Sequence, residues 1–423
     1  MEPMSSKCKR RPVWLIVLIS VSFVLLLLFL VRASLLFVLS YPHRQPDVLI
    51  HGHYDRAFAS VVERFRANFA DGLERSGASL ALYHRSRLVA DVWAGKADTD
   101  SKAVAALSIA HLVDRRVIDF QTPLVDFWPE FGRHSKNGTT VWHVLHHQSG
   151  LPYFERDLRV SDFRNRLAAR RLARQRPAWT PGTATGYHPI TFGPLLDEIV
   201  RRVDGRSLAD YFREEIAIPH DVEVSLGWPN RHTWHERVAR LSDTSFAEIL
   251  HDLLLRPLEV AASQLLDKLQ PENSPIRRAA RFPSWMSVQN LNKWYYGGST
   301  ALPSVTGIAT ARGLATLFQR LIDGSILKNS TLVSALREPV INSWHLEKVV
   351  LWPVMKGHGF FYDTHPHIPH AYTFGHAGWG CQTLLVDPHT ETVLVYLTNG
   401  LKAGTGVACV TATRIIDSVY SIV

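Results

Sequence analysis

The sequence of 423 residues predicts an α+β domain carried on one N-terminal membrane helix. Three observations lead to this fold class. An apolar run near the start is long enough to cross a bilayer, strand patterns occupy both ends of the remaining chain, and helical patterns fill its middle. Strands from both ends can combine into one antiparallel sheet, with the helices between them as an inserted subdomain.

The composition supports a large folded body and limits its partners. Hydrophobic residues make up 46% of the chain and aromatic residues 10%, which excludes bulk disorder. The three cysteines, Cys8, Cys381 and Cys409, are too few for a disulfide scaffold or a Cys-rich zinc module. The net charge of +9 is typical of proteins that meet nucleic acid or a membrane surface. Because basic residues flank the apolar run, we expect a membrane partner and no nucleic acid.

The apolar run, Val13 to Val31, contains 19 uncharged residues. As a helix it covers about 30 Å of hydrocarbon. Four basic residues precede it within 7–11, and only Arg32 follows at once. The positive-inside rule therefore predicts a cytoplasmic segment over 1–12 and a transmembrane helix over 13–35. A cleaved signal peptide is the alternative, but its apolar region is usually shorter and ends in a small-residue cleavage site.

This signal-anchor topology predicts a single-pass protein whose body is exoplasmic, either lumenal or extracellular. We expect a linker over 36–54 and one domain over 55–423. Two glycosylation sequons, at Asn137 and Asn329, agree with that location. Cys381 and Cys409 would lie in an oxidising space and could pair. Membrane lipid around residues 13–35 is the first expected partner.

Strand and helix patterns follow one another along the body. Residues 79–95 read as a hairpin that turns at His84–Arg87, and residues 103–116 read as a mostly buried helix. Further strands are predicted over 357–363, 372–387 and 391–400, and a last helix over 407–421. In this interpretation Gly378-Trp379-Gly380 lies inside a strand run.

Four motifs, together with the helix over 103–116, resemble the serine β-lactamase-related family. They are VWHVLHHQSGLP (141–152), GYHPITFG (186–193), PSVTGIATARGLATLFQRLIDG (303–324) and FGHAGWGCQTLLVDP (374–388). That family includes class C β-lactamases, penicillin-binding proteins, EstB-type esterases and LACTB-like proteins. The resemblance covers roughly residues 55–420, and the order and spacing of the motifs carry it. It implies a β-lactamase-like fold with a cleft between the sheet and the helical subdomain.

The resemblance also implies an acyl-enzyme reaction on an ester, amide or peptide, without a cofactor. In the family, a serine in an S-x-x-K motif at the start of a buried helix attacks a carbonyl carbon. The lysine one turn later helps to remove the serine proton, and a tyrosine from the helical region assists. A K-T-G or H-x-G motif on a strand lines the opposite wall, where backbone N–H groups stabilise the oxyanion.

Two family motifs can be placed in this chain. Tyr187 matches the tyrosine, although Pro189 stands where the family motif has asparagine, and His376-Ala377-Gly378 matches the H-x-G strand. We therefore expect Tyr187 and His376 to be catalytic, and Gly378 and His188 to bind substrate. Lys402-Ala403-Gly404 also fits the K-T-G pattern, but it follows the last predicted strand and we reject it.

The nucleophile motif is where the chain departs from the family. Lys102 stands just before the buried helix, but Thr99 takes the place of the serine three residues earlier. Only six residues separate Gly95 from Lys102, where family members place on the order of 20 more. Thr99 and Lys102 could replace the catalytic pair, Ser101 or another hydroxyl could serve, or both serine and lysine are lost. The third interpretation is the simplest, because so large a gap removes a whole structural element.

The predicted function is thus a membrane-anchored serine-hydrolase homologue with impaired turnover. The alternative is a non-catalytic binding or scaffold protein, a pseudoenzyme that uses the same cleft.

The histidines suggest no metal centre. His143 and His147 are four residues apart, as in a metal-binding pair, but no glutamate of the H-E-x-x-H kind stands between them. His365, His367 and His370 fall in a proline-containing loop. A zinc site would need a third ligand from elsewhere, so we expect ordinary core and surface histidines and neither a metal nor a cofactor.

Overall fold

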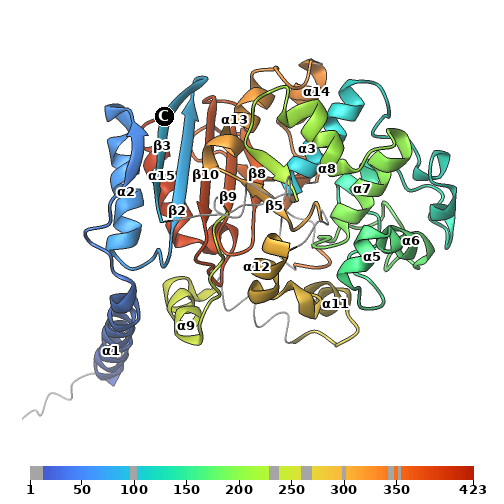
Figure 1. The fold of residues 1–423 in the computed structure, drawn as a ribbon. Helices are drawn as coiled ribbons and strands as arrows, with labels where there is room; N and C mark the ends of the chain where they lie inside the picture. Colours follow the sequence, from blue (N-terminus) through green and yellow to red (C-terminus); the bar gives the residue numbers. More distant parts are fainter. Residues whose placement is uncertain are drawn as a thin grey trace, which may run out of the picture.

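The computed structural model describes residues 13–95, 102–227, 238–258, 269–297, 302–328, 330–341, 347–350 and 354–423. Thr99, Ser101 and the sequon residue Asn329 lie outside the described residues. The body is built from one large antiparallel sheet with helices on both faces and a helical region to one side (Figure 1).

Eight strands form the main sheet in the order β1-β3-β2-β10-β9-β8-β7-β6, and all paired neighbours are antiparallel. The N-terminal hairpin β2–β3 therefore pairs directly with the C-terminal strand β10, as predicted for strands from both ends of the chain. The strands are β1 (His51–Tyr54), β2 (Ala78–His84), β3 (Arg87–Ala94), β6 (Met355–Gly357), β7 (Phe360–Thr364), β8 (Tyr372–Ala377), β9 (Thr383–Asp387) and β10 (Thr392–Thr398). A separate two-stranded sheet joins β4 (Val224–Leu226) to β5 (Gly307–Ala309).

The helices divide between the two faces of the sheet and the region inserted between β3 and β6. Leu80 and Leu82 of β2 pack with α2 and α15 in one core, whereas Ala81 points into the other core with α13. This alternation is what a strand buried on both faces requires. The helices are α1 (Val13–Ser40), α2 (Ala59–Ala70), α3 (Lys102–Asp114), α4 (Val141–Leu145), α5 (Val160–Arg164), α6 (Leu167–Arg174), α7 (Phe192–Val203), α8 (Leu208–Phe212), α9 (Phe246–Leu255), α11 (Pro275–Ala280), α12 (Val288–Gly297), α13 (Ala311–Ile322), α14 (Ser330–Ala335) and α15 (Val410–Tyr420).

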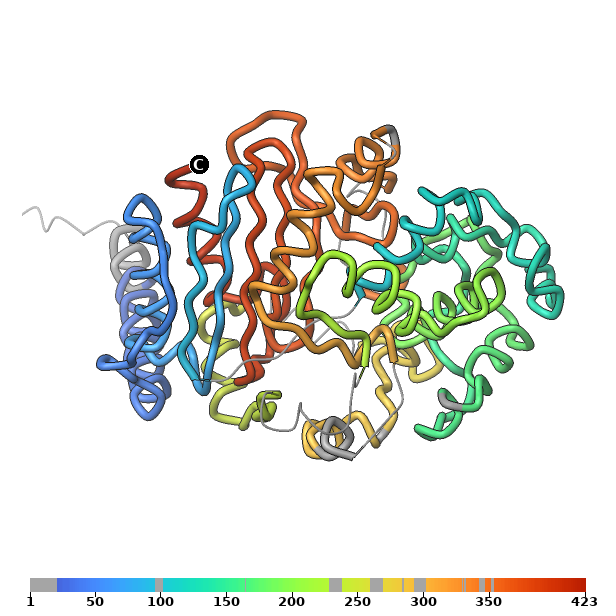
Figure 2. Tube along the Cα trace, turned by 45° about the horizontal axis from the view of Figure 1, so that its top comes forward, coloured from blue at the N-terminus to red at the C-terminus, as the bar shows by residue number. Residues whose placement is uncertain are grey.

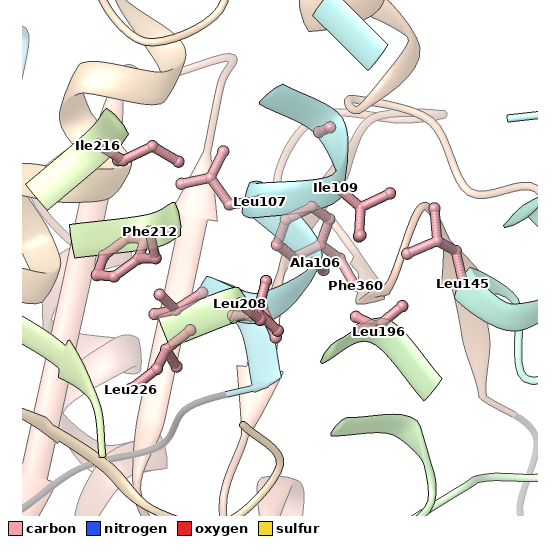
Figure 3. Packing of buried hydrophobic residues seen from close by; sticks show 14 of the residues in the cluster. Ala106, Leu107, Ile109, Leu145, Leu196, Leu208, Phe212, Ile216, Leu226 and Phe360 are labelled. Carbon is pink, nitrogen blue, oxygen red and sulfur yellow. The ribbon is translucent and has the colours of Figure 1, made fainter. Parts of the chain in front are cut away.

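Helix α3 forms the centre of the larger core, which confirms the predicted buried helix. Its residues 103–112 are all buried, among side chains from α4, α7, α8 and β7 (Figure 3). The turn between β6 and β7 approaches α3 very closely. A Cβ at Gly359, whose φ is +88°, would lie 2.5 Å from the Cβ of Ala106. Only glycine fits there, so the turn fixes α3 against the sheet.

The predicted hairpin is present in the structure, whereas one of the predicted C-terminal strands is divided in two. Arg85 and Ser86, with φ values of 49° and 60°, turn the β2–β3 hairpin within the predicted segment, in the primed geometry that suits the twist of its strands. The predicted unbroken strand over 372–387 is wrong. Residues 378–382 form a turn between β8 and β9, because Gly380 and Cys381 take left-handed conformations. Cys381 is joined there to Cys409 by a disulfide bond.

The N-terminal helix extends further than the predicted span. Helix α1 continues to Ser40, and residues 51–54, part of the predicted linker, add strand β1 to the edge of the sheet. Within the described part of the chain, α1 contains the one helical stretch that is long and apolar enough to cross a membrane. Helix α1 contacts α9. Figure 2 shows α1 at one end of the molecule.

A buried ion pair joins the two chain segments that enter and leave the centre of the sheet. The Lys402 Nζ lies 2.9 Å and 3.0 Å from the two carboxylate oxygens of Glu74, and the Thr398 hydroxyl donates to Glu74 Oε1 at 2.7 Å. The Glu74 and Lys402 side chains are 0% and 5% exposed. The Lys402 amine is thus buried and paired with Glu74, which agrees with our rejection of Lys402 as the lysine of a K-T-G motif.

Replacing Glu74 by glutamine should destabilise the protein by about 3–5 kcal/mol, since it leaves the Lys402 ammonium buried without its counter-charge. Urea denaturation of the purified protein measures the change. Glu63→Gln is the matched control, because the Glu63 side chain is 62% exposed and its pairing with Arg66 contributes little. Equal losses in the two variants would contradict a structural role for the buried pair.

Candidate active site

Three aromatic rings form the core of the site, and we call Tyr187, Phe361 and His376 the site wall. Tyr187 precedes α7, Phe361 lies on β7 and His376 on β8. The ring centroids of Phe361 and His376 are 4.7 Å apart and nearly parallel, and that of Tyr187 lies 5.5 Å from Phe361 and 6.3 Å from His376. The fold therefore brings the two predicted catalytic residues, Tyr187 and His376, together from distant segments.

Lys102, the first residue of α3, is linked to the Tyr187 segment through Ser304. Its Nζ donates to the backbone oxygen of Ser304 at 2.7 Å, and the Ser304 hydroxyl donates to the carbonyl of Ile190 at 2.8 Å. Ile190 stands three residues after Tyr187, so the lysine amine is tied to the segment that carries the tyrosine. Gly193 allows this approach, because a Cβ there would lie 2.6 Å from the Ser304 nitrogen.

His188 lies behind the site wall rather than in it. Its side chain is 1% exposed. The Nε2 atom accepts from Leu151 N at 3.2 Å and pairs with the Ser149 hydroxyl at 2.9 Å, while Nδ1 meets the Gly186 carbonyl at 2.5 Å. We predicted that His188 binds substrate. The structure instead uses both ring nitrogens to join the Tyr187 segment to the turn at 149–151.

Gly378 directly follows strand β8 and begins the turn to β9. Its N–H donates to the Gln382 carbonyl at 2.8 Å, and its own carbonyl accepts from the Thr405 hydroxyl at 3.2 Å. Both backbone groups of this predicted substrate-binding residue thus hold the turn between β8 and β9.

A second buried ion pair fixes the backbone of Tyr187. The Lys356 Nζ lies 2.8 Å from Glu347 Oε1, and both side chains are 1% exposed. The same Glu347 oxygen accepts the Tyr187 N–H, and the other oxygen accepts Val349 N at 2.7 Å. Lys356 also donates to the Thr185 hydroxyl at 3.3 Å. The carboxylate therefore couples the tyrosine segment to strand β6, which carries Lys356.

The histidines around the site are held in the neutral form. His147 packs between Tyr187 and Phe192, with centroids 5.2 Å and 4.8 Å away. Burial lowers the pKa of His147 well below its usual value, and the nearby Lys356 charge lowers this pKa further. Burial likewise lowers the pKa of His188 and of His146 to about 3. The three buried histidines behind the site wall are therefore neutral near pH 7.

The histidines considered as metal ligands are used in local structure. His143 Nδ1 accepts the Thr140 N–H at 3.1 Å and caps α4. His365 Nε2 lies 3.0 Å from the Asp387 carboxylate, and His367 Nε2 lies 3.0 Å from the Tyr420 carbonyl. Across the described residues, no group of three or more His, Cys, Asp or Glu side chains is arranged to hold a metal ion.

Several site residues escaped the prediction from sequence. Ser304 contributes a backbone carbonyl, which leaves no residue signature, although it lies in the PSVTG motif. Phe361 stands within a predicted strand but only the register of β7 against β8 brings its ring to His376. Glu347 and Lys356 belong to no motif, and nothing in the sequence pairs them.

With the site's geometry established, the comparisons decide the family. The Beta-lactamase family model matches residues 65–233 and 234–416. The chain belongs to the β-lactamase family. This family member is 29% identical over 402 residues to "Esterase/beta-lactamase LipL" of Mycobacterium tuberculosis strain H37Rv, with 85% of each chain covered.

Solved structures agree with the assignment to the β-lactamase family. A penicillin-binding protein homologue from Caulobacter crescentus is 30% identical and superposes with a TM-score of 0.73, covering 89% of this chain and 100% of the other. A family VIII carboxylesterase superposes with a TM-score of 0.74 over the same shares, and at 24% identity it speaks for the fold alone. The resemblance of the motifs and the predicted fold class are therefore confirmed.

The β-lactamase-family chain should lose stability as the pH falls from 6.5 toward 4.5. The folded pKa of His146 and His188 lies near 3, whereas the unfolded value is about 6.5, so unfolding takes up protons across this window. Each such histidine contributes a slope of up to about 1.4 kcal/mol per pH unit. Urea denaturation at pH 7.5, 6.5, 5.5 and 4.5 measures the slope. His188→Gln should reduce it by one histidine's share, and a slope unchanged in that variant would contradict the assignment.

Glu347→Leu or Lys356→Met alone should cost about 3–5 kcal/mol, since each leaves one buried charge without its partner. The double variant Glu347→Leu with Lys356→Met should recover much of the loss, since no charge is then left buried. A double-mutant cycle by urea denaturation measures the coupling. Lys348→Gln, at an exposed lysine next to Glu347, is the control. Additive effects of the two single changes would contradict a direct interaction.

Proposed function

We propose that this chain is a membrane-anchored serine-hydrolase homologue of the β-lactamase family with impaired turnover. One observation carries the proposal: Tyr187 and His376 lie together in the site wall, and Lys102 is hydrogen-bonded to Ser304, which holds the segment of Tyr187, while no serine stands three residues before Lys102. The acid–base groups of the parent reaction are retained, and the nucleophile is altered.

In the parent reaction, a serine oxygen attacks the carbonyl carbon of an ester or amide and forms a tetrahedral oxyanion. The serine proton passes through the lysine and tyrosine to the leaving alcohol or amine, and water then hydrolyses the acyl-enzyme. In this chain Lys102 and Tyr187 would move the proton, and His376 would contact the bound acyl group. Thr99 holds the nucleophile's sequence position, and its secondary hydroxyl is more hindered than that of serine.

Helix α1 would anchor the protein with its body on the exoplasmic side. The basic residues within 7–11 support that orientation. The Cys381–Cys409 disulfide is typical of oxidising compartments. Asn137 is exposed in a turn before α4, as a glycosylation acceptor must be.

A non-catalytic binding role is the second candidate. The site wall favours a binding role, because Glu347, paired with Lys356, holds the backbone of Tyr187 without any contribution from a nucleophile. Such a pseudoenzyme would bind a small ester, amide or peptide and release it unchanged.

A fluorophosphonate probe and a fluorescent penicillin test the first proposal on the full-length protein in detergent. We expect covalent labelling at least about 10²-fold slower than that of an active family VIII carboxylesterase, the loss typical of an impaired proton-transfer or nucleophile group. Rapid stoichiometric labelling at Thr99 or Ser101, abolished in Tyr187→Phe, would contradict impairment.

Hydrolysis of p-nitrophenyl butyrate separates the two candidates. Slow hydrolysis that falls further in Lys102→Met supports an impaired hydrolase. No hydrolysis, with a rise in Tm on adding the ester that is lost in His376→Ala, supports the binding role instead.

A further inference from the structure

Helix α9 buries two polar side chains against the protein and exposes two large apolar ones, while its four leucines are half-buried. His251 and Asp252 are 3% and 8% exposed, whereas Phe246 is 82% and Ile249 37% exposed. A surface helix of a soluble domain shows the opposite arrangement, with its apolar stripe toward the core. Leu258, just after the helix, is 81% exposed.

This orientation is fixed by polar contacts on the inner face. The Asp252 carboxylate accepts from Arg75 at 2.5 Å and from the Ala403 N–H at 2.8 Å. Arg75, whose side chain is 3% exposed, also donates to the Glu248 carbonyl at 3.2 Å. Rotating α9 about its axis to bury its apolar side chains would break the ion pair between Asp252 and Arg75. The cost of leaving these charges unpaired therefore keeps the apolar side chains facing outward.

The C-terminal end of α9 is attached to α1. Arg32 donates through Nε to the Leu254 carbonyl at 2.9 Å and through Nη2 to the Leu255 carbonyl at 3.5 Å. Arg32 is the charge that closes the run of 19 uncharged residues. Arg32 lies within α1, which continues to Ser40, and a guanidinium on a membrane helix extends toward the headgroup level of a bilayer. The anchor therefore sets the depth of α9.

We propose that α9 lies in the membrane interface, with Phe246, Ile249 and Leu258 inserted among the lipid headgroups. The inference rests on the proposed role of α1 as a membrane anchor. Figure 1 shows α9 beside α1, with α11 along the same side of the molecule, and Phe282, which follows α11, is 57% exposed. An interfacial helix of this kind binds by its buried apolar area.

Two attachments, α1 and α9, would prevent the domain from swinging about a single anchor. Asp252 of α9 is hydrogen-bonded to Arg75 and Ala403. Arg75 precedes β2 and Ala403 follows β10, so these contacts connect α9 to the sheet. Phe361 and His376 of the site wall, on β7 and β8 of that sheet, thereby keep one orientation to the bilayer.

Spin labelling of the full-length protein tests the proposal. In a Cys8→Ser background, Phe246→Cys carries a nitroxide, because Cys381 and Cys409 are joined in a disulfide. The protein is reconstituted in vesicles of phosphatidylcholine and phosphatidylserine. We expect the label at 246 to collide more with oxygen, which partitions into lipid, than with a water-soluble nickel complex. Ile218→Cys is the matched control, since Ile218 is 67% exposed and stands six residues after the end of α8, a helix that Figure 1 shows away from α1.

A third label, at Leu25→Cys in α1, separates the two proposals. Lipid exposure at 25 with water exposure at 246 overturns the role of α9 and leaves the anchor intact. Water exposure at both positions overturns the anchor and the role of α9 with it. Spectral broadening between labels at 246 on two copies overturns the lipid interface in favour of a second copy of this chain.

Discussion

The buried ion pair between Lys356 and Glu347 is the interaction on which the candidate site depends. It takes two charges out of water, a cost of several kcal/mol for each ion that close pairing and further hydrogen bonds must offset. Glu347 does so by accepting from Lys356, Tyr187 N and Val349 N at once. A single carboxylate thus joins strand β6, the tyrosine segment and its own loop. Its charge partner also helps to keep the neighbouring imidazoles neutral.

Around this pair, further hydrogen bonds hold the segments that carry Lys102 and Tyr187. Lys102 is held by the Ser304 carbonyl, and Ser304 in turn holds the tyrosine segment through Ile190. Helix α3, which begins at Lys102, is buried along most of its length. It packs between the sheet and the helical region.

Buried charged residues also hold α9 on the surface of the protein. The Glu74–Lys402 pair fixes the segments that border the centre of the sheet, and the neighbouring Arg75 and Ala403 hold α9 through Asp252. On a surface helix of a soluble domain, a charged side chain such as that of Asp252 would face water, whereas Asp252 of α9 faces the protein. The protein thereby ties an apolar outer face to the same framework that carries the site wall, so the orientation of the site and that of the outer face are mechanically linked.

The sequence by itself determined the class of the fold, the buried helix after Lys102, the hairpin at His84–Arg87 and the positions of Tyr187 and His376. Each of these depends on local periodicity or on a motif whose residue types are visible. Only the tertiary structure decided that Glu347 meets Lys356, that a Ser304 carbonyl receives Lys102, and that His188 faces the core. These contacts join segments far apart in the chain, often through backbone atoms, and so leave no residue pattern. Periodicity likewise gives α9 an apolar face, but only packing decides whether that face meets the core or the outside.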